Sequence, residues 1–168
     1  GMNVEGFWYN KALFEQVGAE VPTTWDELLA VCDLFMENDI QPLATGGSDK
    51  WPSSRIINAY TYRTMGADAI QKAANGELSY TDEGFVAAAQ MLSDMVNKGY
   101  FGEGATTVDN TTAENMLLAG QCAMIYDGSW FTSAITADTN PAGADGIGFI
   151  GVPVVDESIS PATEYPMN

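Results

Sequence analysis

Two tryptophans directly follow apolar, strand-like segments and could offer flat surfaces to a ligand. Trp51 follows a glycine-rich loop after one such segment, and Trp130 follows the Asp127-Gly128 turn after another. Loops at strand ends are where α/β folds place ligands. A sugar presents flat C–H faces rimmed by hydroxyl groups, and aromatic rings combined with paired polar groups suit both features. The two residues therefore favour a carbohydrate-binding surface, with packing in the core as the alternative.

Polar and small neighbours could complete such a surface. Asp127 could accept hydrogen bonds from two hydroxyls, and Arg55, one turn beyond Trp51, could donate several. The alternatives are a helix N-cap for Asp127 and a surface ion pair for Arg55. Gly128 would allow close backbone approach, although a simple turn explains it equally well. We expect the substrate-binding residues to be Trp51, Arg55, Asp127, Gly128 and Trp130.

Patterns typical of catalysis or metal binding do not occur in a suitable context. The chain has no histidine, which is the commonest general base and metal ligand. Cys32 and Cys122 do not form a metal-like pair and are expected to be buried thiols. The acidic pair Asp26-Glu27 falls in the first turn of a predicted helix, whereas a glycosidase needs two carboxyls across a cleft. We therefore expect no enzyme activity, no cofactor and no metal.

Length and charge restrict the possible partners. The 168 residues suit one domain, and no apolar run approaches the roughly 20 residues that a membrane span needs. The net charge of −17 repels nucleic acid phosphates and anionic lipids. We expect no nucleic acid partner and no insertion of this segment into a membrane.

The elements that must position these residues alternate between strands and helices. This alternation favours a small, helix-rich α/β layer structure. Strands are predicted at 4–9, 40–45, 123–126 and 147–152, and helices at 10–17, 24–36, 52–65, 67–74, 81–98 and 111–118.

Capping residues mark several helix boundaries. Thr24 with Glu27, and Thr111 with Glu114, match the capping box. Thr81 is expected to cap the helix that ends before Gly99. The helix from Thr24 is expected to bury Trp25, Leu28, Leu29, Cys32, Phe35 and Met36. The helix after Thr81 is expected to bury Phe85, Ala88, Ala89, Leu92, Met95 and Val96.

The order of four short motifs resembles one known family. They are Tyr9-Asn10-Lys11, the PTTWDEL stretch at 22–28, the GQCAM stretch at 120–124, and the GSW stretch at 128–130. In this order they resemble the second lobe of bacterial extracellular solute-binding proteins of family 1, which deliver sugars to ABC importers. The resemblance implies one helix-rich α/β lobe of a periplasmic-binding-protein-like, type II fold.

The resemblance also implies a transport role for the whole protein. A mono- or oligosaccharide would bind between two lobes that close like a hinge, and the closed form would meet an ABC permease. Family members often use aromatic residues at the places of Trp51 and Trp130. The whole bacterial protein would be extracellular, anchored to the cell surface as a lipoprotein, or periplasmic. The alternatives are a stand-alone carbohydrate-recognition or interaction module and an importer protein for a peptide or polyamine.

The resemblance further implies that this chain is only part of such a protein. We expect residues 2–155 to form a partial second lobe and residues 156–168 to form a loose C-terminal segment. The first lobe and the final part of the second lobe would be missing. Gly1, ahead of Met2, is interpreted as a residue left by tag removal.

Overall fold

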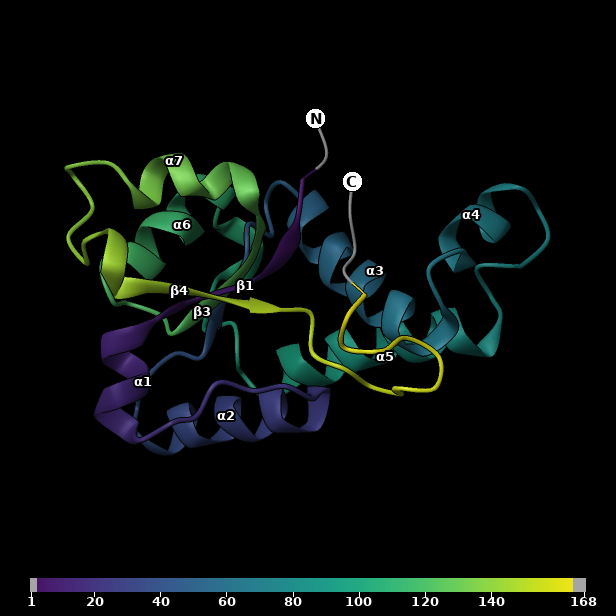
Figure 1. Ribbon diagram of the computed structural model, residues 1–168, viewed down its shortest axis with the longest axis horizontal. Helices are drawn as coiled ribbons and strands as arrows, with labels where there is room; N and C mark the ends of the chain where they lie inside the picture. Colours follow the sequence, from purple (N-terminus) through teal and green to yellow (C-terminus); the bar gives the residue numbers. More distant parts are fainter. Residues whose placement is uncertain (1–2, 165–168) are drawn as a thin grey trace.

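A four-stranded sheet lies between two groups of helices in the computed structural model, which describes residues 3–164 (Figure 1). Helices α1 and α2 cover one face and α6 and α7 cover the other, while α3 and α5 pack together beside the sheet. The strands are β1 (Glu5–Asn10), β2 (Leu43–Ala44), β3 (Met124–Gly128) and β4 (Ile147–Gly151). The helices are α1 (Lys11–Val17), α2 (Trp25–Glu37), α3 (Trp51–Met65), α4 (Ala69–Ala74), α5 (Glu83–Asn97), α6 (Asn110–Leu118) and α7 (Thr132–Ile135). Three 3₁₀ turns are η1 (Ala105–Thr107), η2 (Ser129–Phe131) and η3 (Ala144–Gly146).

The strand order is β2-β3-β1-β4, and the directions are mixed. Strand β1 is antiparallel to both β3 and β4, whereas β2 runs parallel to β3. The carboxyl ends of β2 and β3 therefore meet at the same edge of the sheet. The expected strand at 40–45 is shorter in the structure, because only Leu43 and Ala44 pair with β3. The other predicted strands and the helix-rich α/β class are confirmed.

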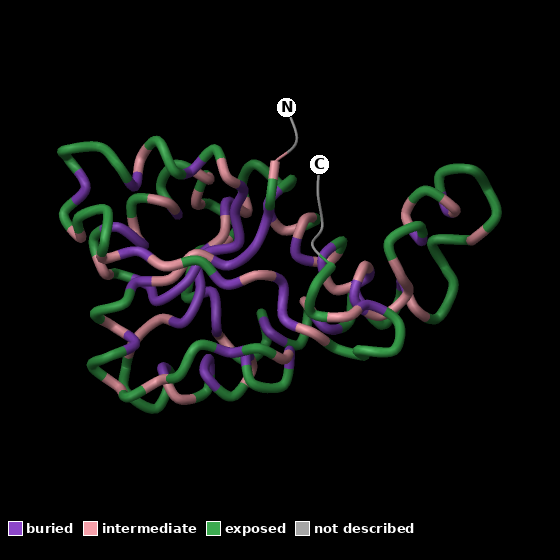
Figure 2. The backbone as a smooth tube through the Cα atoms, viewed as in Figure 1, coloured by how far each residue is buried: buried purple, intermediate pink, exposed green. Residues whose placement is uncertain are grey.

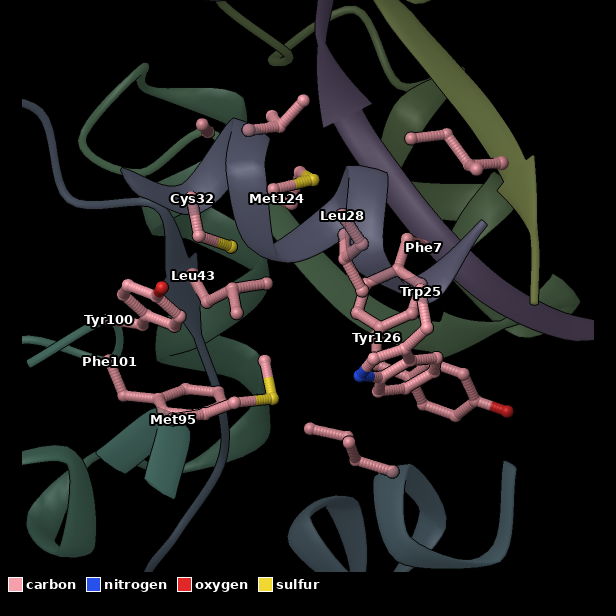
Figure 3. Close-up of a cluster of buried hydrophobic side chains, with 14 of the residues drawn as sticks. Phe7, Trp25, Leu28, Cys32, Leu43, Met95, Tyr100, Phe101, Met124 and Tyr126 are labelled. Carbon is pink, nitrogen blue, oxygen red and sulfur yellow. The ribbon is translucent and has the colours of Figure 1, made fainter. Parts of the chain in front are cut away.

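Alternation along the strands divides the core into two layers. Phe7 on β1 lies opposite Tyr126 on β3, and both rings pack toward α1 and α2. The next pair, Trp8 and Ile125, points to the other face, where Phe131 joins it. This is the expected result of a two-residue side-chain period. Figure 2 shows the buried strands crossing the centre of the molecule, and Figure 3 shows the layer around Phe7.

One predicted capping box is confirmed at the start of α2. The amide of Glu27 donates to Thr24 Oγ1 at 3.2 Å, and the amide of Thr24 donates to Glu27 Oε2 at 3.2 Å. Together these bonds satisfy two amides that the helix itself leaves without partners. Gly18, with φ of 68°, ends α1 in the left-handed conformation, as expected.

The other two predicted caps are wrong. Helix α5 begins after Asp82 rather than Thr81, and α6 begins after Asp109 rather than Thr111. Asp109 Oδ1 accepts from the amide of Thr112 at 2.7 Å, so the cap lies two residues earlier than predicted. Aspartate is as good an N-cap as threonine, and the local sequence offers both. Glu114 is therefore not part of a capping box.

The predicted helix faces were too wide. In α5 the buried residues are Phe85, Ala88, Met91 and Met95, whereas Ala89 and Val96 are exposed. In α2, Met36 is also exposed. Each of these misassigned residues lies at the flank of the apolar stripe, where a helix packed against one neighbour reaches solvent. Cys32 and Cys122 are fully buried free thiols, and burial raises both thiol pKa values.

The segment after residue 155 has no helix or strand through residue 164, but part of it is packed. Ser160 is fully buried, and its hydroxyl accepts from Arg63 Nη1 at 2.9 Å. Arg63 also donates from Nη2 to the carbonyl of Val152 at 2.7 Å. This buried guanidinium ties the segment to α3, where we expected a loose end. Gly1 and residues 165–168 lie outside the described residues.

Candidate ligand-binding site

The two candidate tryptophans lie together at the carboxyl edge of the parallel strands. Trp51 opens α3 after the loop that leaves β2, and Trp130 lies in η2 directly after β3. Their ring centroids are 5.8 Å apart and the ring planes meet at 66°, which is an edge-to-face contact. Trp51 remains 38% exposed and Trp130 remains 36% exposed. The pair therefore forms an aromatic corner that is open to a ligand.

Gly128 provides the space in which the Trp130 indole lies. A Cβ atom built at Gly128 would come within 2.1 Å of Trp130 Cζ3. The backbone conformation itself does not require glycine, because φ is −96°. The missing side chain thus serves close approach, here by the protein's own indole ring.

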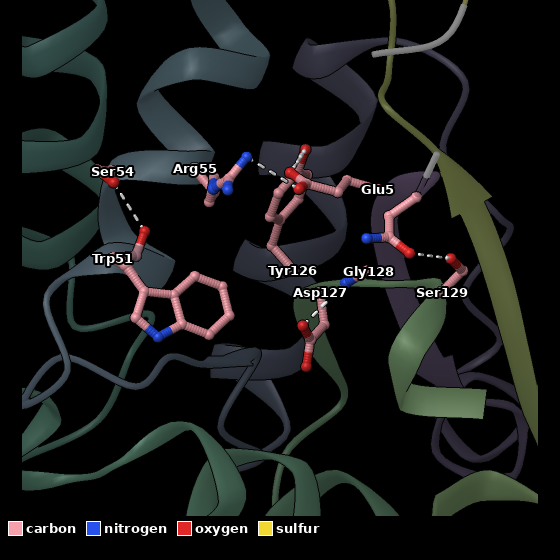
Figure 4. Close-up of polar contacts among 9 residues, drawn as sticks. Glu5, Trp51, Ser54, Arg55, Tyr126, Asp127, Gly128 and Ser129 are labelled. Atoms are coloured by element: carbon pink, nitrogen blue, oxygen red, sulfur yellow. Dashed lines mark hydrogen bonds and ion pairs between the residues drawn. The ribbon is translucent and has the colours of Figure 1, made fainter. Parts of the chain in front are cut away.

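Asp127 lies beneath the aromatic corner rather than in it. Its side chain is 1% exposed, with Oδ1 accepting from the Gly128 amide at 2.8 Å and Oδ2 accepting from Asn110 Nδ2 at 3.1 Å. Figure 4 shows this carboxylate beside the indole of Trp51. The residue that caps η2 is Gly128, so the N-cap alternative is wrong. Both oxygens of this carboxylate therefore accept hydrogen bonds from the protein itself, and the side chain is not exposed to a ligand at the surface.

Arg55 forms an ion pair with a carboxylate that the sequence analysis did not single out. Its Nη1 lies 3.1 Å from Glu5 Oε1, and the Glu5 side chain is only 4% exposed. The Tyr126 hydroxyl donates to Glu5 Oε2 at 3.4 Å (Figure 4). Burial, followed by the charge of Glu5, raises the pKa of Tyr126. Arg55 is one-third exposed and has a five-donor guanidinium, so it can reach a ligand while held by Glu5.

Asn110 and Glu114 at the start of α6 are further residues that sequence reasoning missed. Asn110 Nδ2 donates to Glu114 Oε1 at 3.1 Å as well as to Asp127 Oδ2. Burial, then the hydrogen bond and the charge of Asp127, raise the pKa of Glu114 to about 8. The mistaken capping box concealed Glu114, because it assigned this carboxylate to the helix end.

The loop before Trp51 is fixed against the same helix. The Ser48 amide donates to the carbonyl of Val108 at 3.0 Å. A Cβ atom at Gly46 would lie 2.6 Å from the Asn110 nitrogen, so glycine permits close packing there. The glycine-rich loop therefore positions Trp51 by contact with the chain that leads into α6.

Other features of the described residues do not suggest a competing catalytic or metal site. A groove of about 640 Å³ between α2, α3 and α5 is lined by Trp25, Tyr60, Met91 and others, but not by Trp51 or Trp130. Among residues 3–164, no cluster of three or more potential metal ligands occurs. Within the same range no helix has the length and apolar character to cross a membrane.

Known proteins are similar to this chain in sequence over part of their own length. An uncharacterised ABC transporter extracellular-binding protein of Pyrococcus horikoshii is 30% identical over 125 residues, covering 73% of this chain and 28% of the relative. The alpha-glucosides-binding periplasmic protein AglE of Rhizobium meliloti is 29% identical over 109 residues, covering 62% of this chain and 24% of the relative. The chain thus spans about a quarter of the length of these two relatives.

Solved structures share the fold. A chitin oligosaccharide binding protein superposes with a TM-score of 0.87 at 31% identity, over 92% of this chain and 39% of the other. A protein from a study of xylan utilisation by Caldanaerobius polysaccharolyticus gives a TM-score of 0.90 at 27% identity, over 99% of this chain and 42% of the other. The family of bacterial extracellular solute-binding proteins, whose members bind solutes rather than catalyse reactions, matches residues 2–166. Because this match covers nearly the whole chain, the chain belongs to this family.

Proposed function

We propose that the whole protein is the carbohydrate-binding component of an ABC importer and that this chain forms one wall of its binding cleft. The observation that carries the proposal is the half-exposed pair Trp51 and Trp130 at the carboxyl ends of parallel strands. Relatives and structural neighbours whose names include alpha-glucosides and chitin oligosaccharides support a sugar ligand.

In this proposal the sugar ring packs against one or both indoles. Apolar C–H faces suit the rings, while Arg55 donates hydrogen bonds to hydroxyl groups. Gly128 keeps Trp130 close to the strand end, and Asp127 acts from below by holding the backbone at this turn. A second lobe, outside this chain, would close over the sugar, and the closed form would engage the permease outside the cytoplasm. No catalytic step is part of this function.

A second candidate is an importer protein for a cationic solute such as a polyamine. The net charge of −17 favours this ligand class, because a strongly acidic protein attracts cations. At the aromatic corner, however, the charges are mixed. Arg55 is a one-third exposed cation whose acidic partner Glu5 is buried, and the exposed Asp49 adjoins the exposed Lys50. The local charge therefore favours a neutral, hydroxyl-rich ligand.

A thermal-shift screen of the whole protein tests the proposal directly. A ligand that binds only the folded state raises the melting temperature, so we expect a shift with one series of mono- or oligosaccharides. Peptides and polyamines belong in the same screen. A shift with polyamines or peptides and none with sugars would contradict the carbohydrate assignment.

Affinity of this chain alone provides an independent measurement. If a complete cleft binds at about 1 µM, half of the contact free energy corresponds to about 1 mM. We therefore expect millimolar binding in a titration of the 168-residue chain with the sugar found in the screen. Micromolar binding would show that one wall suffices, as in a stand-alone recognition module.

A further inference from the structure

Asn110 forms hydrogen bonds to residues shortly before each of the two tryptophans. Its backbone amide donates to Asp49 Oδ2 at 2.8 Å, across 61 positions of sequence. Its side-chain Nδ2 donates to Asp127 Oδ2 at 3.1 Å, and the same nitrogen donates to Glu114 Oε1 at 3.1 Å. Asn110 thus contacts the loop before Trp51, the end of β3 before Trp130, and a second residue of its own helix.

Each contact acts close to a tryptophan. Asp49 lies two residues before Trp51, and Asp127 precedes the glycine on which the Trp130 indole lies. The sheet gives these loops limited support, because β2 and β3 are paired over two residues only. Hydrogen bonds from Asn110, at the start of α6, connect the loop before Trp51 with the end of β3.

We propose that Asn110 and Glu114 are positioning residues, which hold Trp51 and Trp130 in their edge-to-face contact through hydrogen bonds to Asp49 and Asp127. Glu114 takes part as a neutral acid whose hydroxyl group donates a hydrogen bond to Asp127. Asp127 from β3 and Asp49 from the loop before α3 each accept a hydrogen bond from Asn110, and Asp109 caps the same helix. Lys50 adjoins Asp49 as an exposed cation, but the groups bonded to Asn110 are all acids. A further negative charge in this position would repel Asp127 and open the network.

This arrangement makes the aromatic corner sensitive to pH. The pKa of Glu114 is raised to about 8. Below that value the carboxyl group carries the proton that joins it to Asp127, and above it two adjacent carboxylates repel each other. Glutamine at position 114 would keep an amide donor for Asp127 and an oxygen acceptor for Asn110, but would not ionise.

The test observes the tryptophan pair directly and needs no ligand. Two coupled indoles give paired positive and negative bands in circular dichroism, whose amplitude falls steeply with separation and changes with orientation. Trp8 and Trp25 make their described ring contacts with phenylalanine and tyrosine, so the paired bands report on Trp51 and Trp130. Subtracting the spectrum of Trp51→Phe isolates this signal. The importance of the pair for a ligand rests on the proposed function, whereas this measurement remains valid if the sugar assignment fails.

Asn110→Ala is the first variant to measure. Alanine keeps the helix and the backbone bond to Asp49 but removes the side-chain bridge, so we expect loss of most of the paired-band amplitude. Asn115→Ala is the matched control, because Asn115 is an exposed asparagine on the same helix. Full amplitude in Asn110→Ala would overturn the proposal, as would an equal loss in both variants.

The pH titration keeps the proposal testable if Asn110→Ala fails to fold. In the unmodified chain we expect the paired bands to weaken as the pH rises from about 6 to about 9, with a midpoint near the pKa of Glu114. In Glu114→Gln we expect constant bands over the same range. A flat titration of the unmodified chain, or a parallel decline in Glu114→Gln, would overturn the role of Glu114.

Discussion

The four tryptophans of this chain fall into two pairs with opposite surroundings. Trp25 is buried, with its ring 5.0 Å from that of Tyr60 and 6.0 Å from that of Phe7. Trp8 is half-buried on β1, and its Nε1 donates to the carbonyl of Asp127 at 3.2 Å. Trp51 and Trp130 contact each other and remain over one-third exposed. The same residue type is therefore packed against other aromatic rings of the fold in one pair and leaves an aromatic surface exposed in the other.

The largest expected effect is on the stability of the chain, which should fall much more when a buried tryptophan is replaced than when an exposed one is replaced. Trp25→Ala leaves a cavity between α2, α3 and the sheet, so we expect the free energy of unfolding to fall by about 3–5 kcal/mol. Trp51→Ala removes a partly exposed ring and should change it by less than about 1 kcal/mol. Urea unfolding of both variants checks this difference. Equal losses would show that Trp51 is a core residue.

A smaller effect is expected from a side chain placed under Trp130. Gly128→Ala forces the indole away from the strand end, and we expect a loss of about 1–3 kcal/mol in urea unfolding together with weaker paired bands. Gly146→Ala is a suitable control, because its Cβ would meet only the Cβ of Ala142, at 3.2 Å. A Gly128→Ala variant with unchanged stability and spectrum would contradict the close packing.

Ligand affinity should depend on the exposed pair, Trp51 and Trp130, although these residues contribute less to stability than the core tryptophan Trp25. In the whole protein, Trp51→Ala or Trp130→Ala should each raise the Kd of the sugar identified by thermal shift by about tenfold, or about 1.4 kcal/mol. Tyr80→Ala is the control, because Tyr80 is an exposed aromatic residue near α5, outside the aromatic corner. Calorimetric titration measures all three variants. Equal affinity in the tryptophan variants and the unmodified protein would assign sugar binding elsewhere.

The last expected effect concerns pH and stability at the aromatic corner, where solvent around the half-buried Glu114 reduces the free energy linked to its titration. Glu114 has its folded-state pKa raised from 4.5 to about 8, so between these values the folded state binds more protons than the unfolded state. Stability from this group is therefore present at low pH and declines as the pH rises through that window. Urea unfolding at about pH 5 and about pH 8.5 should show a larger decline in the unmodified chain than in Glu114→Gln. Identical declines would remove Glu114 as the cause.

Local patterns predicted much of the fold. The capping box at Thr24 and the stop at Gly18 depend on residues within four positions of each other, and both are confirmed. The N-cap of α6 was predicted wrongly because two capping residues compete there. Asp109 lies two positions before Thr111, and either residue can cap a helix. Ala89 and Val96, at the edges of the apolar face of α5, were predicted to be buried but are exposed. Periodicity indicates which side of a helix faces the core better than it indicates how far around the helix the buried face extends.

The binding roles of Trp51 and Trp130 remain predictions, but the structure brings both residues to one edge of the sheet. Their position after strand-like runs was visible in the sequence. The partners of the polar residues were not visible, because Arg55 on α3 meets Glu5 on β1, and Asp127 on β3 meets Asn110 on α6. Such contacts depend on how elements pack, which no short pattern specifies.

The sequence by itself determined the family, the alternation of strands and helices, and the place of two tryptophans after strand-like segments, because motif order and side-chain periodicity are properties of neighbouring residues. Only the tertiary structure decided that Asp127 is buried and that the Trp130 indole lies on Gly128. Only the tertiary structure also showed that Asn110 binds Asp49, 61 positions away, and Asp127, 17 positions away. Burial and hydrogen bonding across such separations arise when the sheet and α6 pack together. The chemistry of a side chain then follows from its neighbours in space.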